Sequence, residues 1–159
     1  MTKQNTSQVG IRDVIKQTLT TQRFGVLASR RDKFPYPTLV AFSVSPDLSE
    51  ILFTTQKESR KYENLQNDPH VSFLVDNRRN SSEDLADAVV VTGFGRVKKC
   101  SEFSASPVEL REIFLEKHPE LQKFVNSPST HSVIVKISTY QVISKFLNVQ
   151  ELDLEQEGD

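Results

Sequence analysis

The residues of this sequence that are best suited to bind a charged ligand lie in one short segment, and their side chains are hydroxyls and cations. They are Thr54, Thr55, Ser59, Arg60 and Lys61. Thr55 forms a capping-box pair with Glu58 three positions later, which predicts that a helix begins just after Thr55. The free backbone N–H groups at such a helix start, the positive end of its dipole and two cations favour an anion of phosphate size.

The same cluster has a second interpretation, in which it is the solvated face of a short helix. Lys57, Arg60 and Lys61 would then be exposed, and Thr55 would be a structural cap. Cations near a helix start are slightly unfavourable to the helix dipole, which favours a bound anion. On charge alone, the solvated face is nevertheless the stronger of the two interpretations.

The segment that carries these residues is predicted to be a strand, a helix and a second strand. Apolar residues at 51 and 53 and a threonine at 55 show the two-residue period of a half-buried strand. Tyr62 and Leu65 share one helical face and can dock the helix, and the Asn-Asp-Pro run at 67–69 ends it. The two-residue period resumes over 71–75, so the cluster lies where a strand turns into a short helix.

The run F-T-T-x-x-x-S-R-K-x-x-x-L-x-x-x-P-x-V-S-F-L, from Phe53 to Leu74, resembles the flavin-phosphate segment of the pyridoxamine 5′-phosphate oxidase-like family, the FMN-binding split barrels. The stretch P-Y-P-T-L-V-A at 35–41, followed by a turn and I-L-F-T at 51–54, resembles the adjoining hairpin of that family. The resemblance extends from about Phe24 to Val97, and more loosely to a C-terminal strand that ends near Phe146.

The resemblance implies an α+β fold, a six-stranded antiparallel split β-barrel with peripheral helices, which binds FMN as a homodimer. The phosphate would be bound by Thr54, Thr55, Ser59, Arg60 and Lys61, and the flavin would lie along Thr38, Leu39, Val40 and Ala41, mainly against backbone groups. In the family the flavin lies in the dimer cleft, so a second subunit would complete the site. The implied function is a flavin-dependent oxidoreductase for a small molecule, in which the cofactor carries the chemistry.

The sequence departs from the oxidase proper at two places. That enzyme has an arginine, a phosphate ligand, where Thr38 falls, and it has an Arg-x-His element near its C-terminus, which the stretch from Val142 to Leu152 lacks. Oxidation of pyridoxamine 5′-phosphate is therefore not expected, and the substrate stays open.

Other functions on the same barrel stay open as well. One is a non-enzymatic flavin or haem binder, because the 114–119 region loosely resembles relatives that serve haem utilisation. His118 would then contact haem, although a role at a helix start is the favoured interpretation. Another is a deazaflavin-dependent reductase, and a third is a structural dimerisation domain with an empty site.

The rest of the sequence fits one domain of 159 residues. We expect a loose N-terminus over 1–8, the split-barrel domain over 9–149 and a disordered acidic tail over 150–159. Apolar periodicity predicts a helix over 9–19 and strands over 24–29, 36–44, 88–98, 131–138 and 142–147. A second helix is predicted to follow Ser106 and to end near Lys117, and Gly93 and Gly95 predict a bulge or a close backbone approach within a strand.

Composition excludes several classes of protein. A net charge of −1 and a pI near 6.3 give no basis for nucleic-acid binding. No apolar run approaches the length of a membrane span, so a cytoplasmic protein without membrane contacts is expected. A single cysteine, Cys100, allows no intrachain disulfide, and the three histidines are too far apart in sequence to predict a metal site.

Overall fold

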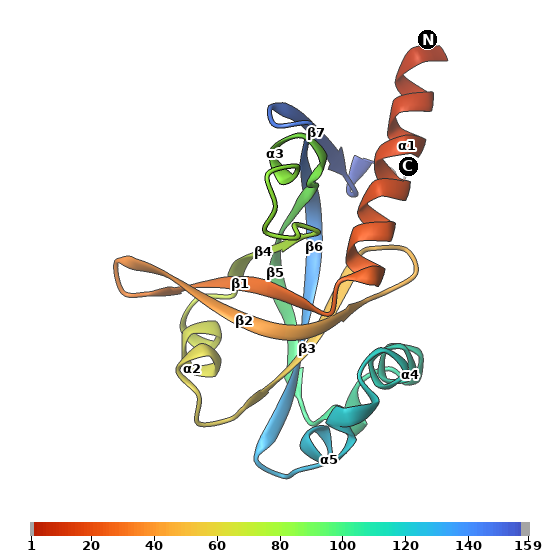
Figure 1. The fold of residues 1–159 in the computed structure, drawn as a ribbon. Helices are drawn as coiled ribbons and strands as arrows, with labels where there is room; N and C mark the ends of the chain where they lie inside the picture. The colour runs from red at the N-terminus through yellow and green to blue at the C-terminus, as the bar shows by residue number, and fades with distance from the viewer. Residues whose placement is uncertain (1, 157–159) are drawn as a thin grey trace.

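The computed structural model describes residues 2–156, which form one seven-stranded antiparallel sheet with helices around it (Figure 1). The elements follow the order α1 (Thr2–Thr21), β1 (Phe24–Arg31), β2 (Phe34–Val44), β3 (Glu50–Gln56), α2 (Arg60–Asn67), β4 (His70–Asp76), α3 (Asp84–Asp87), β5 (Val90–Ser101), η1 (Phe103–Ala105), α4 (Val108–Lys117), η2 (Pro119–Leu121), α5 (Gln122–Val125), β6 (Thr130–Ser144) and β7 (Asn148–Asp153).

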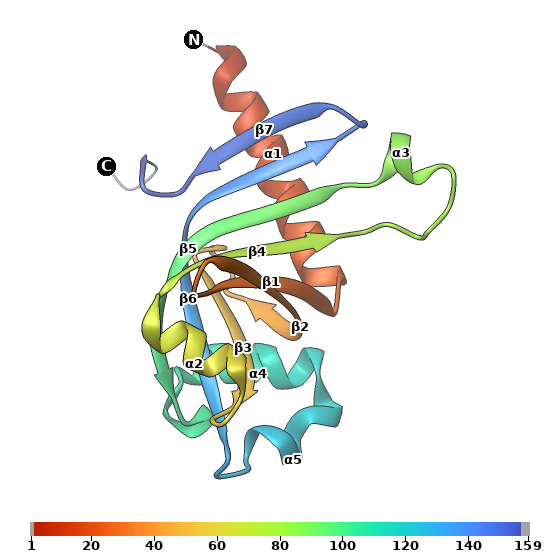
Figure 2. The same cartoon turned by 90° about the vertical axis from the view of Figure 1, so that its left-hand side faces the viewer.

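Six of the strands close into a barrel. The strand order is β3-β2-β1-β4-β5-β6-β7, and an additional pairing of β3 with β6 joins the two ends of the six-stranded part. β7 pairs only with β6 and extends the sheet beyond the barrel (Figure 2). The predicted α+β class and six-stranded antiparallel barrel are confirmed, with β7 as an extra strand.

The barrel is split between β2 and β3. These strands pair only where Phe42–Val44 faces Ile51–Phe53. Residues Phe34–Ala41, the part of β2 before this contact, pair with β1. The part of β3 after Phe53 continues along β6 to Gln56. The two strands therefore diverge, and α2 lies in the angle between them (Figure 1).

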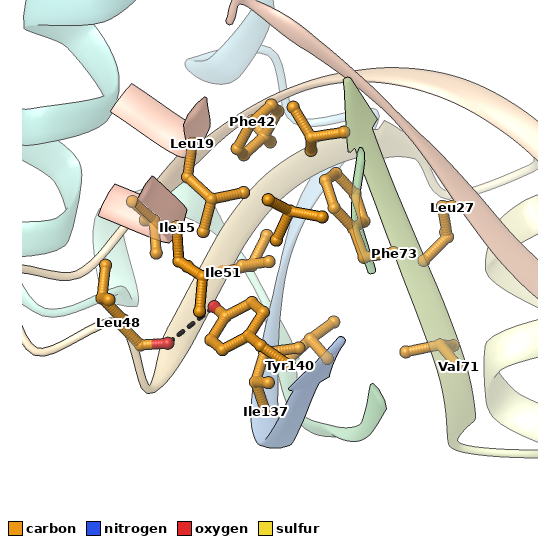
Figure 3. Close-up of a cluster of buried hydrophobic side chains, with 14 of the residues drawn as sticks. Ile15, Leu19, Leu27, Phe42, Leu48, Ile51, Val71, Phe73, Ile137 and Tyr140 are labelled. Atoms are coloured by element: carbon orange, nitrogen blue, oxygen red, sulfur yellow. Dashed lines mark hydrogen bonds between the residues drawn. The ribbon is translucent and has the colours of Figure 1, made fainter. Parts of the chain in front are cut away.

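Apolar side chains fill the barrel interior and cover the inner side of β1 and β2 (Figure 3). Phe42 and Phe73 meet edge to face with ring centroids 4.9 Å apart, and the hydroxyl of buried Tyr140 donates to the Leu48 carbonyl over 2.7 Å. A second apolar cluster lies under α4 and α5, on the other face of β3 and β6. Its buried members are Leu52, Phe103, Leu110, Phe114, Val125 and Ile134.

The ends of the chain differ from the sequence-based expectations. The first helix already begins at Thr2, inside the segment expected to be loose. The two C-terminal strands expected over 131–138 and 142–147 are one long strand, β6, and β7 begins at Asn148 and overlaps the tail that was expected to be disordered. Backbone pairing with β6 orders these acidic residues, which composition alone does not reveal. Met1 and residues 157–159, the end of that tail, lie outside the described residues.

The glycines of β5 behave as predicted. The β5–β6 register shifts between Phe94 and Gly95, which is a bulge. A Cβ on Gly95 would lie 2.1 Å from the carbonyl oxygen of Lys136, so the two backbones approach closely there. Between residues 2 and 156, none of the helices combines the length and the apolar character that crossing a bilayer requires.

Candidate functional site

The helix that carries the S-R-K motif begins later than the capping-box prediction places it. β3 stays paired with β6 as far as Gln56, so Thr55 is extended backbone and cannot be the cap. α2 starts at Arg60, and its N-cap is Ser59, whose hydroxyl accepts from the N–H of Tyr62 over 3.2 Å. Cross-strand pairing therefore overrides the local Thr55–Glu58 motif.

Three of the predicted phosphate ligands converge at this helix start. The hydroxyls of Thr55 and Ser59 are 2.8 Å apart, and Lys61 Nζ donates to Thr55 Oγ1 over 3.2 Å. Thr55 is fully buried, and burial lowers the pKa of the half-buried Lys61 ammonium. A partly desolvated cation beside two hydroxyls and the first N–H groups of a helix is a donor set suited to an anion.

Two other predicted ligands are turned away from this cluster. Arg60 lies 3.4 Å from the Glu63 carboxylate and lines a separate pocket of about 420 Å³ together with Arg30 and Asp68. Thr54 pairs with Ser132 and shares the face of β3 that carries Leu52, next to the α4–α5 cluster. Because successive strand residues point to opposite faces, Thr54 and Thr55 cannot both reach one phosphate through their side chains.

Residues Thr38 to Ala41 lie on β2 beyond the split. Thr38 and Val40 share the inner face with Phe42, whereas Leu39 and Ala41 face outward, and Leu39 is 68% exposed. The edge of this segment that would face β3 has no strand paired with it, so its backbone groups are available to a ligand. Thr38 Oγ1 is buried and has no hydrogen-bond partner in the described part of the chain.

The structure adds two residues that sequence reasoning did not assign to the site, Tyr62 and His131. His131 is directly opposite Thr55 in the β3–β6 ladder. Its Nδ1 is 3.0 Å from the Tyr62 hydroxyl, and the two rings meet edge to face at 5.3 Å. The sequence offers no signal for this arrangement, because only the pairing of β3 with β6 brings residues 55 and 131 together.

His118 is not available as a haem contact, so the prediction that this residue could contact haem is wrong. It is 1% exposed, and its Nε2–H donates to the Phe42 carbonyl over 2.8 Å. Burial is the largest cause that lowers its pKa, so the ring is a neutral structural donor. It precedes the short helix Pro119–Leu121, as the helix-start interpretation predicts.

Comparison with known proteins identifies the family of this chain. The sequence profile described as pyridoxamine 5′-phosphate oxidase matches residues 11–143, which is most of the chain. The chain belongs to the pyridoxamine 5′-phosphate oxidase family. Comparison with curated proteins found no significant match.

Solved structures of this fold include proteins named for different cofactors. A haem-binding protein from Mycobacterium smegmatis is 14% identical with a TM-score of 0.71, over 87% of this chain and 56% of its own. An FAD-binding protein from Mesorhizobium loti is 19% identical with a TM-score of 0.58, over 81% and 89% of the two chains. An F420 reductase is 16% identical with a TM-score of 0.55, over 79% and 94%. At these identities the likeness establishes the fold alone.

Proposed function

We propose that this member of the pyridoxamine 5′-phosphate oxidase family is an FMN-binding flavoprotein that acts as an oxidoreductase on a small molecule. The observation that carries the proposal is the convergence of Thr55, Ser59 and Lys61 at the start of α2. They come from a strand end, a turn and a helix, and their polar groups gather at the split where a flavin phosphate would enter.

The residues present fit FMN. A phosphate oxygen can accept from Lys61, from the two hydroxyls and from first-turn N–H groups of α2, which together form charge-assisted and neutral hydrogen bonds. The unpartnered hydroxyl of Thr38 and the open edge of β2 offer further donors and acceptors for the flavin and its ribityl chain. Bound flavin supplies the electron and hydride transfer, and the protein fixes its position and surroundings.

A homodimer is part of this proposal. On the outer face of the sheet, Leu39, Val26 and Leu74 form one row across β2, β1 and β4, and Pro37 and Ala28 lie in the next row. Phe24 and Phe94 flank these rows and are 55% and 42% exposed. A largely apolar sheet face of this kind needs a cover, and a second copy with the same face can provide it.

FMN titration tests the proposed cofactor. Purified protein should take up FMN with quenching of flavin fluorescence, and it should bind riboflavin, which lacks the phosphate, clearly more weakly. Equal affinity for the two flavins would overturn the phosphate site. A haem spectrum in the protein as purified, or preference for a deazaflavin over FMN, would instead support one of the two alternatives that relatives of this fold represent.

A further inference from the structure

Tyr62 and His131 complete a closed set of contacts around Thr55. The N–H of Tyr62 caps onto Ser59 Oγ, which in turn is bonded to Thr55 Oγ1. The Tyr62 hydroxyl is bonded to His131 Nδ1, and His131 lies opposite Thr55. Opposite residues of antiparallel strands point to the same face with Cβ atoms about 4.5–5.5 Å apart. The imidazole is therefore a direct neighbour of the threonine that accepts from Lys61.

The charges around His131 come from several elements. Burial and the cation of Lys57, in the turn before α2, lower the pKa of His131, and the carboxylate of Glu102, just after β5, acts in the opposite direction. Lys61 is a further cation at this site, since it donates to Thr55 opposite His131, and the titratable side chain of Tyr62 contacts the ring. Without a ligand the site is therefore rich in cations, and a phosphate dianion would reverse the local field and favour the imidazolium.

We propose that His131 is a further ligand of this anion site, and that it contacts the flavin phosphate as an imidazolium held by Tyr62. The inference rests on the proposed phosphate site. As an imidazolium, His131 donates Nδ1–H to the Tyr62 oxygen, and its Nε2–H is the donor that remains for a phosphate oxygen. A ring that is neutral in the free protein then gains a proton when FMN binds, whereas riboflavin binding takes up none.

Affinity measured against pH tests this in variants. The dissociation constants of FMN and riboflavin are measured between about pH 6 and pH 8.5 for the wild type and for His131→Asn. Because the second pKa of a phosphate monoester is near 6, the ligand titrates in the same range, and its titration cancels in the ratio of variant to wild type. The ratio for FMN should rise as the pH falls, reaching about tenfold or more near pH 6, and the ratio for riboflavin should stay flat.

Two further variants define the roles within the pair. Tyr62→Phe keeps the ring and removes the hydroxyl that holds the His131 imidazole. It should therefore reproduce part of the loss of FMN affinity expected for His131→Asn. His70→Asn is the matched control, since His70 is an exposed histidine paired with Asp68, just beyond the C-terminal end of α2. This control should leave the FMN ratio at every pH unchanged.

Calorimetry on the wild-type protein gives a test that does not depend on how the variants fold. FMN binding at about pH 7.5, where the phosphate is mostly dianionic, is measured in two buffers with different ionisation enthalpies. Net proton uptake that is present for FMN and absent for riboflavin is the expected result. No uptake, with a flat His131→Asn ratio and a large loss in Lys61→Ala, would overturn the role of His131 and leave the phosphate site standing. An unchanged FMN affinity in Lys61→Ala would overturn both.

Discussion

Lys61 Nζ donates a hydrogen bond to Thr55 Oγ1 across 3.2 Å, and this contact ties the first turn of α2 to the end of β3. The ammonium is half-buried, and the threonine is fully buried. A neutral hydroxyl compensates a desolvated cation only in part, which is why burial lowers the pKa of Lys61. The negative charge of a phosphate at this position would stabilise the desolvated ammonium. The predictions on ligand binding follow from that.

Replacing Lys61 by alanine should weaken FMN binding about 10- to 150-fold, because a hydrogen bond to a charged group is worth about 1.5–3 kcal/mol. Riboflavin affinity should hardly change. Lys57→Ala is the matched control, since this half-buried lysine lies four residues earlier and outside the S-R-K motif. The effect of Lys57→Ala should be small at about pH 8.5, where His131 of the free protein is neutral. Equal losses in the two variants, or for the two flavins, would contradict the assignment.

Light scattering should give about twice the chain mass of 18.1 kDa at micromolar concentration. Leu39→Glu should convert the dimer to a monomer, because it places a charge at the most exposed apolar position of the outer face of β2, β1 and β4. Val108→Glu, at an exposed apolar position on α4 away from that face, should leave the mass unchanged. A strictly monomeric wild type at high concentration would remove the two-subunit site.

Pyridoxamine 5′-phosphate should not be oxidised faster than by free flavin. The stretch Val142–Leu152 has neither the arginine nor the histidine of the oxidase, and it forms the end of β6 and most of β7. The assay is aldehyde production by FMN-loaded protein. Efficient turnover would mean that other residues bind this substrate.

His118 should make stability depend on pH. Its pKa is lowered in the folded state, so the unfolded state binds more protons as the pH falls below about 6.5. The stabilisation is thus present above that pH and is lost as the pH falls through the folded-state value. His118→Gln retains an N–H donor for the Phe42 carbonyl but does not titrate. Denaturant unfolding at about pH 8 and pH 5.5 should show a larger loss for the wild type than for the variant, and equal losses would refute this origin.

Gly95→Ala should destabilise the fold by about 1–3 kcal/mol, because the added methyl group meets the backbone of β6 and has no flexible neighbour to displace. Gly10→Ala is the matched comparison. Apart from its chain neighbours and the local helix backbone, no described atom lies within 4 Å of the position of its Cβ, and Gly10 is within α1, so this variant should gain up to about 1 kcal/mol. Thermal unfolding of the two variants measures the contrast.

The local pattern of the sequence was sufficient for much of the fold. Two-residue periodicity located the barrel strands, and the resemblance of the S-R-K segment selected the split barrel from the α+β folds that this pattern allows. The helix ending at Lys117 and the bulge at Gly95 also follow from short-range signals. These features depend on contacts or backbone conformations that a few neighbouring residues decide.

Tertiary structure alone decided which candidate residues meet. The motif places Thr54, Thr55 and Arg60 within seven positions of sequence. Strand alternation nevertheless turns Thr54 to the other face, and Arg60 pairs with Glu63. His131 joins Thr55 only because β3 and β6 close the barrel, a pairing between segments that are far apart in the sequence. The sequence motif therefore predicts which residue types bind the anion. Long-range strand pairing decides which individual residues meet at the site, and no local pattern encodes this pairing.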